Sequence, residues 1–162
     1  MSAAHRRLVV ACGNPLRRDD GAGPAAAEGL GASGVAVVIV HQLAPELADD
    51  VAAADAVVFL DARAGPTPGA VETRRVQPAP PPSTLGHACS PEEVLALAAL
   101  VHGVRPRAAL VTVQGADFGL GEGLSPEVAA ALPALRAAAR RFLDQSSRDQ
   151  DSVSSTSGAF EL

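Results

Sequence analysis

Acidic side chains and one histidine occupy three places where an apolar segment gives way to a loop. Asp19 and Asp20 come shortly after the first apolar run of the chain, and Asp61 directly follows a later one. His87 precedes the start of an expected helix. Carboxylate oxygens and an imidazole nitrogen are suitable ligands for a divalent transition metal. The sequence therefore predicts a metal-recognising site, provided that the fold brings these loops together.

Each of these residues also has a simpler interpretation. Asp19 or Asp20 could cap a helix, whose N-terminus favours negative charge. Asp61 could form a turn at a strand end, and His87 could be an exposed loop residue. Cys89 is expected to be a small buried residue rather than a nucleophile. The other histidines have no acidic companion at a useful spacing and are expected to be structural or exposed: His5, His41 and His102.

The elements that must position these residues can be predicted from apolar periodicity. Continuous apolar runs predict strands at 8–12, 35–40, 56–60 and 108–113, of which 8–12 and 56–60 are expected to be buried. The alternating segment 70–76 is typical of an edge or antiparallel strand. Helices are expected at 20–30, 45–54, 91–102 and 126–143. Strands that alternate with helices predict an α/β three-layer sandwich, a mixed and mostly parallel sheet flanked by helices, with its ligand site beyond the carboxyl ends of the strands.

One helix start is well marked. Ser90 is followed by Pro91 and, three residues after the serine, by Glu93, which is the pattern of a capping box. The four prolines between residues 77 and 83 predict an extended loop before it. The buried positions of this helix are expected to be Val94, Leu97, Ala98 and Val101.

The chain divides into two parts by composition. Residues 1–144 have the apolar content of one folded domain, whereas residues 145–162 are rich in serine. We expect this second part to be a disordered tail, because it has too few apolar residues to bury.

Composition excludes several classes of function. All 13 basic residues are arginine, so any mechanism that needs a lysine is excluded. The net charge of −5 and the lack of Trp and Tyr argue against a nucleic-acid partner. No apolar run reaches the roughly 20 residues of a membrane span, and the two cysteines make no disulfide framework. We expect a cytoplasmic protein with no membrane partner.

Four familiar phosphate-binding or hydrolytic sites fail on the residues present. The first turn lacks the three glycines of a dinucleotide fingerprint, and a Gly-x-Ser-x-Gly elbow is absent. A phosphoacceptor receiver domain would explain the acidic pair but needs a lysine. The glycine-rich segment 115–123 contains Asp117 and Glu122 and no basic residue, which disfavours a phosphate cradle.

The segment 12–24, CGNPLRRDDGAGP, strongly resembles the hallmark motif of the nickel–iron hydrogenase maturation proteases. The segment 57–62, VVFLDA, resembles the family's strand that ends in a metal-binding aspartate. His87 resembles the family's histidine ahead of a main helix, and the segment 123–128, GLSPEV, resembles its late helix start. The resemblance covers about residues 7 to 143.

This resemblance implies a phosphorylase/hydrolase-like fold and an aspartic-type endopeptidase. Its partner would be the precursor of a hydrogenase large subunit, from which it cuts a short C-terminal extension after nickel insertion. The nickel is carried by the substrate rather than by the protease. The resemblance implies that Asp20, Asp61 and His87 recognise this nickel and form the catalytic site, whereas Asp19 supports the loop and a helix start.

The sequence departs from the family pattern at two loops. Residues 41–47 stand where many members have an acidic-Gly-Gly segment, and residues 114–118 stand where many have a Pro-Glu pair. These differences leave the type of hydrogenase open. A non-catalytic chaperone that docks the nickel-loaded subunit, and a hydrolase with a resident metal, are the alternatives to the protease.

Overall fold

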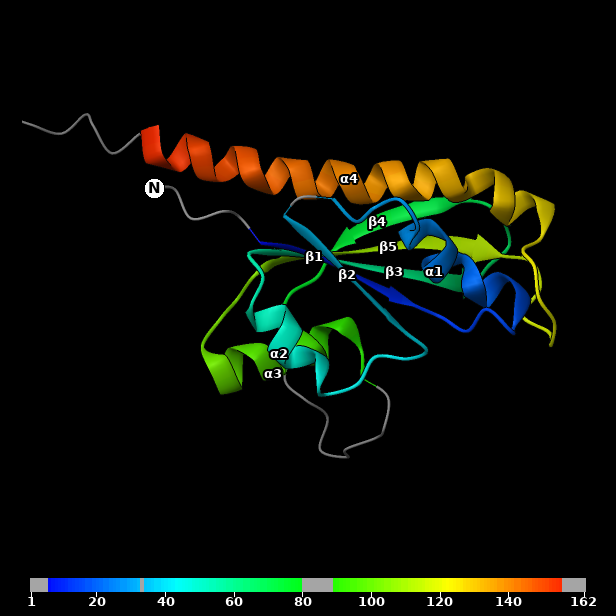
Figure 1. Cartoon of the computed structure of the whole chain (residues 1–162), viewed down its shortest axis with the longest axis horizontal. Coiled ribbons are helices and arrows are strands. Elements are labelled where there is room, and N and C mark those ends of the chain that lie inside the picture. The colour runs from blue at the N-terminus through cyan, green and yellow to red at the C-terminus, as the bar shows by residue number, and fades with distance from the viewer. Residues whose placement is uncertain (1–5, 33, 80–88, 156–162) are drawn as a thin grey trace, which may run out of the picture.

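The centre of the molecule is a five-stranded sheet (Figure 1). The structure, a computed structural model, describes residues 6–32, 34–79 and 89–155, and gives the backbone alone for 146–155. The strands are β1 (Arg7–Cys12), β2 (Val35–Val40), β3 (Ala56–Ala64), β4 (Val71–Arg75) and β5 (Arg107–Gly115). Their spatial order is β2-β1-β3-β5-β4, with β4 antiparallel to β5 and the other pairs parallel.

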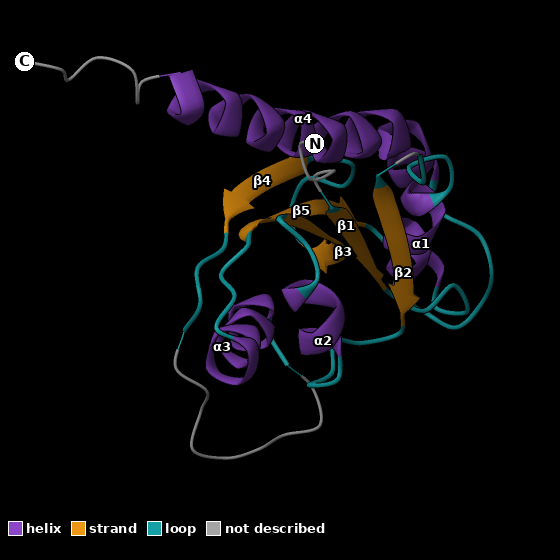
Figure 2. Ribbon diagram, turned by 60° about the vertical axis from the view of Figure 1, so that its left-hand side comes forward, coloured by secondary structure: helices purple, strands orange, loops and turns teal. Residues whose placement is uncertain are grey.

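Helices cover both faces of the sheet, which gives the predicted three layers (Figure 2). Helix α4 (Pro126–Ser155) and the short α1 (Ala22–Ala27) lie on one face. Helices α2 (Leu47–Ala52) and α3 (Pro91–His102) lie on the other. A single 3-10 turn, η1 (Arg18–Gly21), precedes α1. The predicted fold class is confirmed, and no helix of the described chain is long and apolar enough to cross a membrane.

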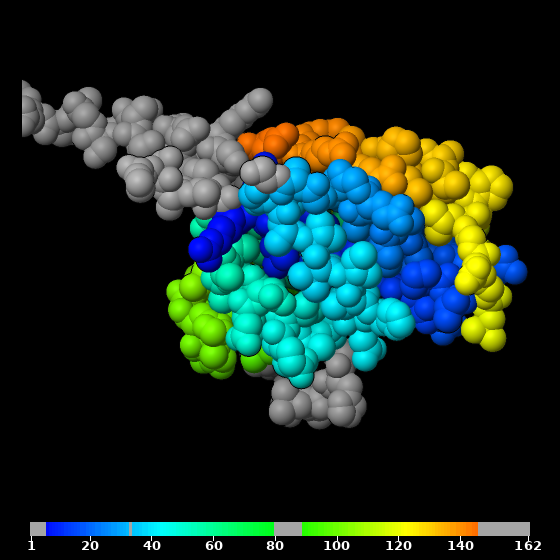
Figure 3. All heavy atoms as spheres, in the orientation of Figure 1, coloured from blue at the N-terminus to red at the C-terminus, as the bar shows by residue number. Residues whose placement is uncertain are grey.

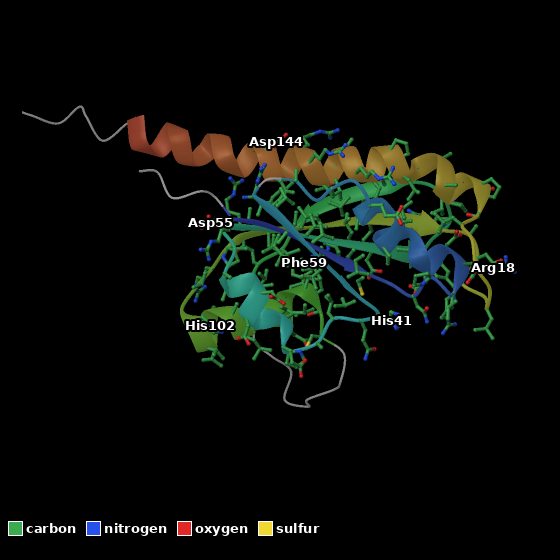
Figure 4. The ribbon with its side chains drawn as sticks, viewed as in Figure 1. Arg18, His41, Asp55, Phe59, His102 and Asp144 are labelled. Atoms are coloured by element: carbon green, nitrogen blue, oxygen red, sulfur yellow. The ribbon has the colours of Figure 1, made fainter. Side chains whose placement is uncertain are left out.

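Strand β3 explains why its apolar run is continuous rather than alternating. Val58 and Leu60 belong to the apolar cluster beneath α1 and α4, and Val57 and Phe59 belong to the cluster beneath α2 and α3. All four side chains are at most 1 % exposed, and Phe59 lies at the centre of the molecule (Figure 4). A strand covered on both faces needs apolar residues at every position. Burial of these side chains fixes the strand that carries the candidate site.

The capping box of α3 forms as predicted. The hydroxyl of Ser90 accepts a hydrogen bond from the backbone N–H of Glu93 at 3.2 Å. The predicted buried stripe is only partly correct, because Val94 and Ala98 are buried but Val101 is 66 % exposed. Leu95 is buried in its place, since α3 packs against both the sheet and α2.

Two helices differ in length from their predictions. The helix expected over 20–30 ends at Ala27, and its first turn is the separate 3-10 helix η1. Helix α4 continues to Ser155 rather than ending near Leu143. No glycine or proline occurs between residues 134 and 157, so nothing in the backbone stops the helix there. The division into a domain and a tail stays a prediction, since residues 156–162 lie outside the described residues.

A candidate active site at the carboxyl edge of the sheet

The sheet has a switch point between β1 and β3. The chain leaves β1 for the outer strand β2 on one side, whereas β3 leads to β5 and β4 on the other side. In open α/β sheets the crevice beyond the carboxyl ends at such a point is the usual ligand site. Asp20 follows β1, and Asp61 lies in β3. The topology therefore brings two of the predicted site residues to one crevice.

Asp61 is reached one position after the pairing of β1 with β3 ends. Leu60 is the last residue of β3 that pairs with β1, where its partner is Ala11. The prediction that the strand ends at Asp61 was wrong, because β3 continues to Ala64 along β5. One edge of β3 is thus open beside Asp61. Side chains alternate along a strand, so Asp61 shares the face of Phe59, beneath which α2 and α3 pack.

Electrostatic coupling shows that Asp20, Asp61 and Cys12 form one cluster, here called the acidic site. Burial and the negative charge of Asp20 raise the pKa of Asp61 to about 6, although the N–H of Ala62 donates to its Oδ1 at 2.8 Å. Burial, Asp61 and Asp20 raise the pKa of the Cys12 thiol to about 12. Two carboxylates in one partly buried place are poised to bind a cation or to exchange a proton.

The segment 12–24 folds into a loop that closes around the carboxylate of Asp20. The backbone N–H of Asn14 donates to Oδ2 of Asp20 at 2.7 Å. Gly13 has φ of +148°, and a Cβ at this position would lie 1.8 Å from the carbonyl oxygen of Asp20. The side chain of Asn14 also accepts from the N–H of Leu16 at 3.0 Å. Glycine and asparagine are required here because the loop closes on the carboxylate.

Asp19 has a different role from its neighbour. It is fully buried, and its carboxylate accepts four hydrogen bonds, from the N–H groups of Ala116, Asp117 and Ser125 and from the Ser125 hydroxyl. Burial raises the pKa of Asp19, but these hydrogen bonds outweigh burial and lower it overall. The resemblance implies that Asp19 supports its own loop and the helix start that follows it, but its carboxylate instead holds the start of α4, which begins directly after Ser125.

Neither aspartate caps the first helix. No side chain makes a capping hydrogen bond at the start of η1 or of α1. The capping interpretation of Asp19 and Asp20 was therefore wrong. The reason is tertiary, since Asp19 is used by a distant loop and Asp20 by the backbone of Asn14.

The loop after β5 holds the loop after β1 in place. The N–H of Arg18 donates to the carbonyl of Gly121 at 3.0 Å, and the N–H of Gly121 donates to that of Leu16 at 2.9 Å. Arg18 has φ of +48°, a strained conformation for a residue with a side chain. Figure 3 shows the two segments in contact, one in yellow and one in blue. Such a support keeps Asp20 in a fixed position.

His87, the third predicted site residue, lies outside the described residues. The described chain resumes at Cys89, whose N–H donates to the carbonyl of Leu43 at 3.1 Å. The thiol of Cys12 donates to the carbonyl of His41 at 3.6 Å. The loop after β2 thus connects the segment before α3 with the acidic site. His41 directly follows β2, which ends at this edge of the sheet. Its position after a strand indicates that it lies near the acidic site, whereas its spacing from acidic residues in the sequence did not.

His102 lies at the other end of the molecule (Figure 4). It is exposed, as expected, and its Nε2 is 2.7 Å from Oδ1 of Asp49, a partner that lies 53 residues away in the sequence. Helices α2 and α3 pack together and bring the two residues close. Among the described residues, no group of three histidine, cysteine or acidic side chains could hold a metal by itself.

A cavity of about 330 Å³ opens directly beside Asp61. It extends across β3, β5 and β4 and is lined by Asp61, Arg63, Glu72, Arg74, Leu110 and Thr112, among others. A second cavity, of about 400 Å³, lies at the amino ends of β1 and β2, where Leu8 and Val35 line it. The first cavity is the relevant one for chemistry, because it shares a carboxylate with the acidic site.

Comparison with known proteins agrees with this geometry at the level of the fold. No family model and no curated protein matches the chain. Among solved structures, the hydrogenase maturating endopeptidase HybD from E. coli is similar with a TM-score of 0.70 and 23 % identity, over 87 % of this chain and 93 % of that one. The chain has the maturation-protease fold.

Two archaeal structures support the same assignment. The NiFe hydrogenase maturation protease HybD from Thermococcus kodakarensis has a TM-score of 0.66 and 24 % identity, over 84 % of this chain and 97 % of that one. The maturation protease HycI from the same organism has a TM-score of 0.66 and 23 % identity, over 88 % and 95 % of the two chains. The resemblance inferred from the motifs is thus confirmed for the maturation-protease fold.

Proposed function

We propose that this chain is an endopeptidase that removes the C-terminal extension of a nickel–iron hydrogenase large subunit after nickel insertion. The observation that carries the proposal is the coupling of Asp20 and Asp61 at the switch point of a chain with the maturation-protease fold. Asp20 comes from the turn η1 after β1 and Asp61 from within β3, so the fold brings two carboxylates from separate segments to one place. The structures with this fold named above are hydrogenase maturation proteases.

The nickel in this proposal belongs to the substrate. Cysteine thiolates of the precursor hold it, and Asp20, Asp61 and His87 complete its coordination with oxygen and nitrogen ligands. Support for His87 comes from its chain neighbour Cys89, which is hydrogen-bonded to the loop beside Cys12. A precursor without nickel lacks the metal that both proteins coordinate, and it binds weakly. Only a subunit that has already received its nickel is therefore processed.

Docking through the metal also positions the scissile peptide bond. A bond held against the acidic site reacts as if within one molecule, which removes much of the entropic barrier. Asp61, with a pKa of about 6, is mostly ionised at neutral pH and can accept a proton from an attacking water. We place this reaction in the cytoplasm, because Cys12 and Cys89 are both free thiols.

Intact mass spectrometry tests the proposal. The full chain is incubated with nickel-loaded and with nickel-free precursor, and only the loaded precursor is expected to lose the mass of a C-terminal peptide. Asp61→Asn and His87→Ala abolish this loss. The matched controls are Asp50→Asn and His102→Ala, which lie away from the acidic site and retain it. Tight binding of loaded precursor without any mass change would show the chaperone alternative instead.

A further inference from the structure

The cavity beside Asp61 occupies a part of the sheet that the helices leave open. Helices α2 and α3 pack beneath the half of the sheet that contains the amino ends of the strands (Figure 1). Asp61 and Thr112 are paired across β3 and β5 at the carboxyl half, and both line the cavity. Leu110, on the same face, contributes an apolar part of the lining. A channel about 330 Å³ in volume therefore leads from the acidic site toward the edge strand β4.

Thr112 is a polar residue between apolar neighbours in β5, and it lines the cavity. Its neighbours Val111 and Val113 are apolar, and Thr112 itself is only 8 % exposed. Within the part of the chain that the structure describes, no hydrogen bond reaches its hydroxyl. No buried side-chain oxygen or nitrogen of the described residues lacks a partner, so the Thr112 hydroxyl keeps contact with water. Because Thr112 lines the cavity, a ligand there can replace this water as the partner of its hydroxyl.

Each of the two arginines that line the cavity is paired with a glutamate. Arg63 pairs with Glu72 at 3.1 Å, and Arg74 pairs with Glu92 at 2.6 Å. Both guanidinium groups are thus already neutralised, which disfavours a phosphate or another small anion as the ligand. An apolar floor, the Thr112 hydroxyl and two already paired arginines fit an extended ligand with its own N–H and C=O groups.

We propose that this channel, lined by Asp61, Leu110 and Thr112, binds the extended polypeptide that adjoins the scissile bond. The hydroxyl of Thr112 hydrogen-bonds to the main chain of that segment, while Leu110 contacts one of its side chains. The channel begins at Asp61, so a chain lying in it passes the acidic site. This inference rests on the proposed function, since the peptide is the substrate of that reaction.

The test compares Thr112→Val with the exposed Thr67→Val as a matched control. With nickel-loaded precursor, Thr112→Val is expected to raise KM and to lower kcat/KM about three- to tenfold, the effect of one lost hydrogen bond. Thr112→Ser restores the hydroxyl and most of the activity. Thr112→Val should be at least as stable as the wild type in urea, which separates substrate binding from a structural role. Leu110→Arg obstructs the channel, and Leu100→Arg on the exposed side of α3 is its control.

Precursor affinity is measured alongside cleavage. The two measurements distinguish a failure of the protease proposal from a failure of the channel proposal. Wild-type protein that binds loaded precursor but does not cut it contradicts the protease, and Thr112→Val must then still weaken binding. Cleavage by Thr112→Val at the wild-type kcat/KM overturns the channel proposal alone. A loss of activity that follows a loss of stability, and that Thr112→Ser does not restore, overturns it too. Wild-type protein that neither binds nor cuts overturns both.

Discussion

The carboxylate of Asp19 accepts two hydrogen bonds from Ser125, one from the backbone N–H at 2.7 Å and one from the hydroxyl at 2.9 Å. These bonds join the loop after β1 to the first turn of α4, across more than a hundred residues of sequence. The next residue, Asp20, is thereby held toward Asp61. The two adjacent aspartates thus have different roles: Asp19 supports the structure, and Asp20 faces the acidic site.

Replacing Asp19 with Asn is expected to destabilise the fold by about 2–4 kcal/mol, because the amide cannot accept all four hydrogen bonds and leaves buried donors unpaired. Urea unfolding at pH 7 measures the change. The exposed Asp49→Asn, which alters the hydrogen bond with His102, should cost under about 1 kcal/mol. Equal effects of the two substitutions would contradict the structural role of Asp19.

The wild type and Asp19→Asn are also expected to differ in how their stability depends on pH. Since the folded state lowers the pKa of Asp19, its carboxylate stabilises the fold at pH values above its unfolded pKa of about 3.9. This stabilisation is lost as the pH falls through the lower, folded-state pKa. The stability difference between wild type and Asp19→Asn should therefore shrink below about pH 4.

A Gly23→Ala substitution is expected to displace α1. A Cβ at this position would lie 2.6 Å from the carbonyl oxygen of Cys12 and 2.9 Å from that of Leu60, so the helix must move away from β1 and β3. We expect a loss of about 1–3 kcal/mol, typical of overpacking, together with slower processing because the Asp20 loop shifts. Gly31→Ala is the control, since its Cβ would meet only a methyl of Val37 at 3.7 Å. Thermal unfolding of both variants decides the point.

Local signals in the sequence were sufficient for much of the fold. The continuous apolar run of β2, the alternation of β4 and the Ser90 cap of α3 each depend on neighbours along the chain, and all three were predicted correctly. The order of strands and helices then placed Asp20 and Asp61 at one edge of the sheet.

Features that depend on distant contacts could not be predicted. The extension of β3 past Asp61 needs β5 as a partner, and the burial of Asp19 needs the loop that ends at Ser125. The role of Thr112 requires knowing which face of β5 the helices leave open. The pair of His102 with Asp49 likewise exists only because α2 and α3 are packed together.

Asp61→Asn is expected to stabilise the protein at neutral pH while abolishing processing. The folded state raises the pKa of Asp61 to about 6, so between about pH 4 and 6 the folded state binds more protons than the unfolded state. The wild type therefore loses stability as the pH rises through this range, by roughly 3 kcal/mol. Asparagine cannot ionise, and its advantage should be largest above pH 7 and vanish near pH 4. Urea unfolding at both pH values is the measurement, with exposed Asp50→Asn as the control for one lost charge.

The cysteines are expected to be dispensable for peptide-bond cleavage. Burial and two neighbouring carboxylates raise the pKa of the Cys12 thiol to about 12, so almost none of it is the nucleophilic thiolate at neutral pH. Burial together with Glu93 and Glu46 also raises the pKa of Cys89. The double variant Cys12→Ala/Cys89→Ala should therefore process nickel-loaded precursor at a rate within about threefold of the wild type, less than 1 kcal/mol of transition-state stabilisation. Iodoacetamide should label the native chain slowly and the urea-unfolded chain fast. Complete loss of cleavage in a double variant that remains folded would instead assign the nucleophile to a thiol and remove water as the attacking group.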